Sequence, residues 1–147
     1  VYSGAVDATI LAAAGLRRLG IEPEQAIELP LSQWLPAPGQ GVIVVQCRTE
    51  DERVRHRLAA IQSNESMAVV TAERAVIQRL GGDCRMPLAA WAEQQQGLIL
   101  RARLGDLNGR LIDAEGRGEV SHAARLGLQV AEQLIEQGGD ELLQSLE

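Results

Sequence analysis

The sequence predicts a mixed fold, in which an α/β part is followed by a C-terminal α+β part. A stretch rich in proline and glycine, residues 30–41, separates two differently patterned regions of the 147-residue chain. Directly after it, residues 42–47 form an apolar, β-branched run typical of a strand buried on both faces of a parallel or mixed sheet. Beyond residue 87, three strand-like runs lie between two helical patterns, which favours a three-stranded antiparallel sheet with helices on one face.

The first elements are defined by residues that start and stop helices. Residues 7–19 have helical propensity, with Asp7 as the N-cap and Gly20 as the stop. We expect a short strand over residues 25–29, before the proline-rich connector.

Two helices are expected after the apolar run. Thr49 caps a charged helix over residues 50–61, in which Val54, Leu58 and Ile61 recur at spacings of four and three. Ser63 opens the next helix, which ends at Gly81-Gly82 and carries an apolar face made of Val69, Val70, Ala72, Val76 and Leu80.

The final region returns to a helix after its three strand-like runs. A helix is expected over residues 122–137, followed by a stop at Gly138-Gly139 and a short amphipathic tail. The expected strands cover residues 88–93, 98–104 and 111–115.

Composition excludes several classes of protein. The formal net charge of -6 argues against a nucleic-acid or membrane partner, because both reward a basic surface. All 14 basic residues are arginine, the side chain that best forms paired hydrogen bonds with carboxylates. Two cysteines are too few for a disulfide scaffold, and their spacing fits no metal site. We therefore expect a cytoplasmic protein without a bound metal.

Cys84 is the most informative single residue, because it is a lone thiol on a glycine-rich loop. It lies in the run Arg79-Leu-Gly-Gly-Asp-Cys-Arg-Met-Pro-Leu88. Loops lie at the surface, and glycines leave the backbone free to expose a side chain. From the residues alone a buried, inert cysteine remains the alternative to a reactive one.

Four motifs in order resemble the porphobilinogen deaminase (hydroxymethylbilane synthase) family over nearly the whole chain. They are a helix end at 13–19 (Ala-Ala-Gly-Leu-Arg-Arg-Leu), a connector at 35–48 (Leu-Pro-Ala-Pro-Gly-Gln-Gly-Val-Ile-Val-Val-Gln-Cys-Arg), Thr-Ala-Glu-Arg at 71–74 and Gly-Gly-Asp-Cys-Arg-Met-Pro at 81–87. The sequence departs from the family at Asp83, since glycine usually precedes the cysteine, and at Gln46, where the family often has Glu.

The resemblance implies that Cys84 holds a dipyrromethane cofactor through a thioether. Sulfur suits this task, because a thiolate captures the electrophilic methylene left when porphobilinogen loses ammonia, and a thioether resists hydrolysis. Arg18 is implied as a ligand of the carboxylate arms of the pyrroles, and Gln40 as a neighbour of the cofactor cleft. Arg17 falls at a variable position of the motif and is interpreted as a surface residue.

The same resemblance implies the domain organisation and the activity. Residues 1–36 are expected to be the tail of a second α/β domain, and residues 37–62 a crossover strand and helix of the first, both periplasmic-binding-protein-like. Residues 63–147 are expected to form the cofactor-carrying α+β domain. The parent enzyme, a transferase, would condense four porphobilinogen units into hydroxymethylbilane and release ammonia, in tetrapyrrole (porphyrin and heme) biosynthesis.

The chain is expected to be the C-terminal half of a monomeric parent. No residue here is assigned as catalytic, because the family's catalytic aspartate belongs to the N-terminal half. The fragment alone is expected to be inactive, to lack the cofactor and to self-associate. Porphobilinogen and the growing polypyrrole are the expected partners. Two alternatives stay open: a non-catalytic α+β interaction module with an incidental cysteine, and a redox-sensing thiol.

Overall fold

The computed structural model describes residues 1–82 and 86–144. The chain divides into two compact units, Val1–Trp34 and Leu35–Glu147. None of the helices in the described residues combines the length and the apolar character needed to cross a membrane.

The first unit holds one short helix, α1 (Ala13–Leu19). Gly20 ends it in the left-handed conformation, with φ of 65°, as its glycine predicts. The prediction of a helix from residue 7 is wrong, since residues 7–12 are not helical, and the strand expected at residues 25–29 does not form. No residue of this unit is buried, so neither element gains the packing that stabilises short helices and strands.

The apolar run at residues 42–47 is extended, but it pairs with no strand of the described chain. Ile43 is 86% exposed and Val44 is 71% exposed, so the prediction of a buried strand is wrong for this structure. A strand needs a neighbour for its backbone groups and its side chains, and the described residues supply none here. The helix that follows, α2 (Glu52–Ala59), is capped by Asp51, whose carboxylate accepts from the N–H of Val54 at 3.0 Å, and not by Thr49.

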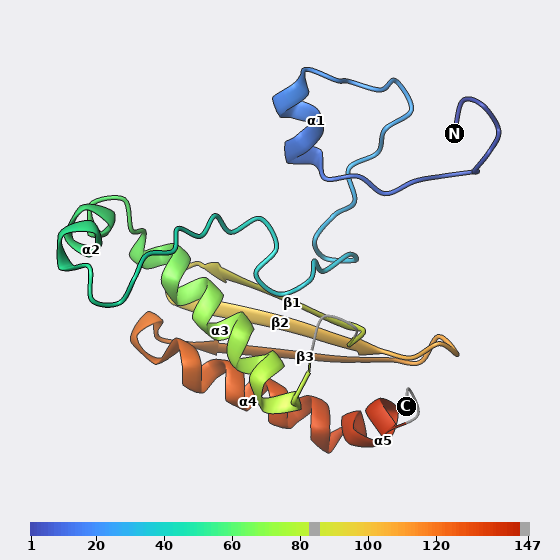
Figure 1. The fold of residues 1–147 in the computed structure, drawn as a ribbon. Helices are drawn as coiled ribbons and strands as arrows, with labels where there is room; N and C mark the ends of the chain where they lie inside the picture. The colour runs from blue at the N-terminus through green and yellow to red at the C-terminus, as the bar shows by residue number, and fades with distance from the viewer. Residues whose placement is uncertain (83–85, 145–147) are drawn as a thin grey trace. The chain divides into compact units, whose positions relative to one another are not determined.

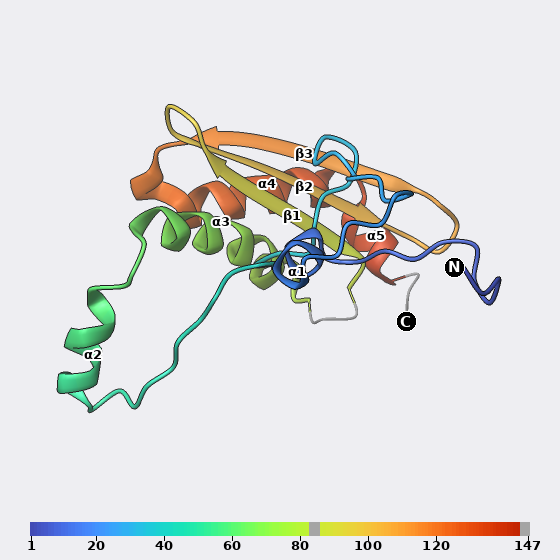
Figure 2. The same cartoon turned by 90° about the horizontal axis from the view of Figure 1, so that it is seen from above.

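The remaining elements form a C-terminal lobe, residues 64–144. Its sheet is antiparallel with strand order β1-β2-β3, and the α+β prediction is confirmed. Figure 1 and Figure 2 show α3 and α4 side by side on one face of this sheet. The elements are α3 (Asn64–Leu80), β1 (Leu88–Gln94), β2 (Leu98–Gly105), β3 (Leu111–Gly118), the 3-10 turn η1 (Val120–His122), α4 (Ala123–Glu136) and α5 (Gly139–Gln144).

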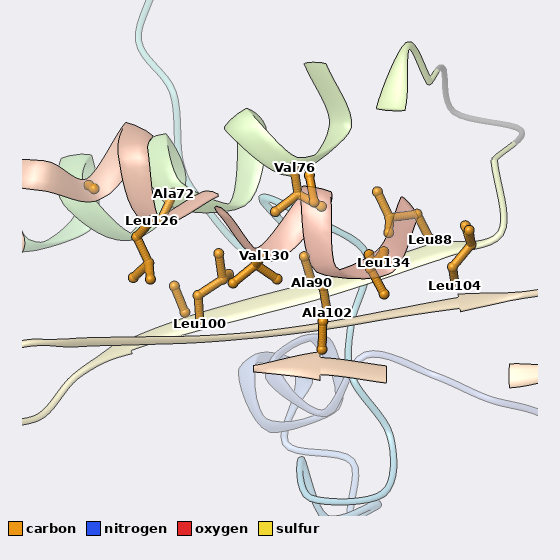
Figure 3. Close-up of a cluster of buried hydrophobic side chains, with 14 of the residues drawn as sticks. Ala72, Val76, Leu88, Ala90, Leu100, Ala102, Leu104, Leu126, Val130 and Leu134 are labelled. Atoms are coloured by element: carbon orange, nitrogen blue, oxygen red, sulfur yellow. The ribbon is translucent and has the colours of Figure 1, made fainter. Parts of the chain in front are cut away.

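The core lies between the sheet and these two helices. Alternate residues of each strand point toward the helices, as the side chains of Leu100, Ala102 and Ala90 do in Figure 3. They meet α3 and α4 residues such as Val76 and Val130, each fully buried. Aliphatic side chains fill this space, because the chain contains no Phe and neither Trp is buried.

Helices α3 and α4 approach very closely at Gly127. A Cβ added there would lie 2.5 Å from the Cβ of Ala75 and would also overlap the carbonyl oxygen of Ala72. Farther along the same helices, Arg79 donates to both carboxylate oxygens of Glu132, at 2.7 and 3.2 Å. The pairing of α3 with α4 therefore depends on a glycine at one place and on a forked ion pair at another.

The opposite face of the sheet carries a ladder of charges. Arg101 on β2 lies between Glu93 on β1, at 3.3 Å, and Glu115 on β3, at 2.9 Å. Arg103, two residues along β2, pairs with Asp113 at 2.6 Å. Arg101 and Arg103 thus stand directly opposite Glu115 and Asp113 on β3, whereas Glu93 on β1 reaches Arg101 diagonally.

Candidate functional site

The connector between the two predicted bodies folds into two successive β-turns. In the first, the N–H of Gln40 donates to the carbonyl of Ala37 at 3.0 Å, with Pro38 and Gly39 in the middle positions. In the second, the N–H of Val42 donates to the carbonyl of Gly39 at 3.3 Å. Gly39 and Gly41 have φ of 73° and 81°, the conformation that the third place of a type II turn requires. The glycines of the Gly-Gln-Gly motif therefore have a backbone role.

Gln40 lies at the exposed tip where the two turns meet. Its side chain makes no hydrogen bond to another described residue, whereas its backbone N–H is used within the turn. An amide held on a defined turn and free of internal partners is available to a ligand. The structure thus places this candidate where a ligand can reach it.

Glu73, on α3, fixes the connector to the C-terminal lobe. Its Oε2 accepts from the N–H of Gly39 at 2.7 Å, and its Oε1 accepts from the N–H of Ala92 on β1 at 2.8 Å. The side chain is only 3% exposed. Burial raises the pKa of this carboxyl above its ordinary value, while the two backbone N–H groups act in the opposite direction.

The connector also covers part of the edge of β1. The N–H of Ala90 donates to the carbonyl of Pro36 at 3.0 Å, and the next N–H on that side, from Ala92, goes to Glu73. Edge strands expose such groups to unwanted pairing. Here one connector carbonyl and one side-chain carboxylate satisfy them, so the position of the connector is coupled to the sheet.

Cys84, the predicted attachment point, lies outside the described residues, as do its neighbours Asp83 and Arg85. The residues on either side of this segment are described. Helix α3 ends at Gly81, whose φ is 69°, and the N–H of Gly82 reaches back to the carbonyl of Ile77 at 3.1 Å. Gly82 also lies against the side chain of Met86, because a Cβ added at Gly82 would be 2.5 Å from the Met86 Cε.

The chain that follows the Cys84 loop is attached to the sheet. The carbonyl of Pro87 accepts from the N–H of Gly105 at 3.1 Å, which ties the returning chain to the end of β2. A Cβ at Gly82 would displace only the flexible end of the Met86 side chain, so this contact does not by itself require glycine there.

An apolar hollow at the exit from this loop does not suit a ligand with many carboxylates. Its lining includes Leu35, Met86 and Leu111. Among the described residues that line it, the one basic side chain is Arg103, which pairs with Asp113.

The two arginines of the first unit, Arg17 and Arg18, are both exposed. Arg17 pairs with Glu28 at the exposed surface. Arg18 is exposed and makes no hydrogen bond or ion pair with another described residue. Arg18 is thus a cation available to a carboxylate, and the donor chemistry of Arg18 and Gln40 fits a polycarboxylate pyrrole.

The other cysteine of the chain lies in the segment between the connector and α2. Cys47 is a free, half-buried thiol in the extended segment after the connector. Within residues 1–82 and 86–144, no group of three or more His, Cys, Asp or Glu side chains could hold a metal ion.

Comparison with known proteins decides the family. Residues 1–56 match a family model described as "Porphobilinogen deaminase, dipyromethane cofactor binding domain", and residues 67–136 match "Porphobilinogen deaminase, C-terminal domain". The chain belongs to the porphobilinogen deaminase family. Curated porphobilinogen deaminases are similar along its length: one from Xanthomonas euvesicatoria is 41% identical and one from Coxiella burnetii is 44% identical, each over 146 residues and 98% of this chain.

The chain spans about half the length of these porphobilinogen deaminases, since the match covers 48% of each. The two family matches divide the candidate residues. Arg18 and Gln40 fall in the part similar to the cofactor-binding domain, whereas Cys84 falls in the part similar to the C-terminal domain. The resemblance inferred from the motifs is thus confirmed at the level of the family.

Sequence reasoning missed Glu73 as an individual residue, although it lies within the Thr-Ala-Glu-Arg motif. The signal was present in the helical pattern. Glu73 follows Val70 by three places and precedes Val76 by three, so it lies on the apolar face of α3. A carboxylate on a buried helix face needs partners, and a search for its partners leads to the connector.

Proposed function

We propose that this chain is the part of a porphobilinogen deaminase that tethers a dipyrromethane cofactor through Cys84. The observation that carries the proposal is the ordered match of residues 1–56 and 67–136 to two parts of that one family. In the complete enzyme, four porphobilinogen units are joined head to tail into hydroxymethylbilane. Each addition forms one carbon–carbon bond, breaks one carbon–nitrogen bond and releases one ammonia, and water supplies the hydroxyl of the released product.

In that reaction, the residues of this chain bind the cofactor and hold it in place. Cys84 holds the cofactor as a thioether, Arg18 binds a carboxylate arm, and Gln40 offers its amide beside the cleft. When bound, the dipyrromethane supplies the primer to which pyrrole units are added.

The remaining groups come from a second half. The exposed apolar side chains of Ile43 and Val44 support our proposal that residues 37–62 complete a domain supplied by that half, which also contains the catalytic aspartate. Residues 1–36 would complete a second domain in the same way. The chain alone is inactive in this proposal, while the whole protein acts as a monomer in the cytoplasm, without nucleic-acid or membrane partners.

Mass spectrometry of the full-length protein tests this proposal. An active preparation should carry the mass of a dipyrromethane on the peptide that contains Cys84, and Cys84→Ser should abolish both the adduct and the formation of hydroxymethylbilane. Cys47→Ser is the matched control, because it removes the other thiol, and it should retain the adduct. An unmodified Cys84 in an active enzyme, or full activity of Cys84→Ser, would contradict the proposal.

A further inference from the structure

Glu73 holds two segments that are distant in the sequence. Its carboxylate bonds to Gly39, 34 residues before it, and to Ala92, 19 residues after it. In a β-turn the N–H of the third residue is not used by the turn itself, so the N–H of Gly39 is free to bond to Glu73. The neighbouring Val70 lies 3.8 Å from the place of a Cβ at Gly39, which brings the turn against α3.

We propose that Glu73 is a positioning residue, which fixes the turn carrying Gln40 relative to α3 and β1, the elements on either side of the Cys84 loop. The functional part of this inference rests on the function proposed above. Helix α3 leads into the Cys84 loop at its C-terminal end and holds the Gln40 turn through a side chain about two turns earlier.

The variant Glu73→Gln separates this role from simple packing. Gln has nearly the same shape as Glu, but its amide has one oxygen and so accepts from only one of the two N–H groups. The N–H of Ala92 is the more buried of the two, and an unsatisfied buried donor is the more unfavourable. The amide oxygen should therefore stay on Ala92, and the N–H of Gly39 should be released.

Residue-resolved amide hydrogen exchange of this chain measures the release directly. In Glu73→Gln the exchange of the Gly39 amide should become about tenfold faster or more, while the Ala92 amide stays protected. The matched control is Val76→Ala, one turn further along α3 and fully buried. It should lower the stability of the lobe without raising the exchange of Gly39 relative to Ala92.

The full-length enzyme supplies the functional measurement. Glu73→Gln should still carry the adduct on Cys84, with kcat reduced about tenfold by the misplaced turn, whereas Val76→Ala should retain kcat at temperatures where it is folded. Unchanged protection of Gly39 in Glu73→Gln, or equal loss of protection at Gly39 and Ala92, overturns the positioning role. A wild-type enzyme without the adduct would instead overturn the proposed function and leave the exchange result valid.

Discussion

Gly127→Ala should destabilise the C-terminal lobe, because α3 leaves no room for a methyl group. The new Cβ would lie 2.5 Å from the Cβ of Ala75 and would overlap the backbone of Ala72, so the whole of α3 must move. Overpacking of this kind is unfavourable by up to about 3 kcal/mol. The greater helix propensity of Ala returns about 1 kcal/mol. The expected net loss is about 2 kcal/mol in the free energy of unfolding.

Urea and thermal unfolding, followed by circular dichroism, measure this loss. The expected loss corresponds to a decrease of about 10 °C in Tm for a domain of this size. Gly118→Ala is the matched control, since a Cβ there would lie 3.7 Å from Leu126, an ordinary contact distance. Its effect should stay within about 0.5 kcal/mol. If Gly127→Ala is as stable as the unmodified chain, the close approach of α3 and α4 is not the constraint that we infer.

Two further predictions concern Glu73 and the position of the core. Burial raises the pKa of Glu73, so its contribution to the free energy of unfolding is greatest below the ordinary pKa of 4.5 and declines as the pH rises toward the raised pKa. In urea titrations, the stability of the unmodified chain relative to Glu73→Gln should fall over that range of pH. A difference in stability that does not change with pH would contradict the raised pKa. No residue before Ala68 is buried, so trypsin should cut at Arg48 and in α2 well before it cuts at Arg101 within the sheet. Equally early cleavage in the sheet would contradict a core that is confined to the C-terminal lobe.

The helices and strands whose packing partners lie within this chain were predictable from sequence. Helix α3, the three strands and α4 form close to where their periodicity places them, because each buries its apolar face against another of the set. The run at residues 42–47 has an equally clear strand pattern and forms no strand in the described chain. A strand pattern indicates that a segment needs a neighbouring strand and a buried surface. No described segment provides these for residues 42–47.

The candidate site divides in a similar way. Cys84, Arg18 and Gln40 could be selected from sequence, because a motif marks each residue directly. The two roles of Glu73 could not, because they depend on a turn and a strand that meet only after folding. The sequence does reveal that a carboxylate lies on the apolar face of α3, but it does not reveal which N–H groups satisfy that carboxylate.

The charge ladder on the outer face of the sheet selects one alignment of the strands among several that hydrophobicity alone would accept. Inward and outward residues alternate with a period of two, so sliding β3 by two places along β2 would keep its inward residues, such as Ile112 and Ala114, on the side of the helices. One such slip would place Arg117 opposite Arg101 and keep one favourable pair, Arg103 with Glu115. The other would place Leu111 opposite Arg103 and keep Arg101 with Asp113. Only the observed alignment places Glu115 opposite Arg101 and Asp113 opposite Arg103 at the same time, so these two ion pairs favour the observed register.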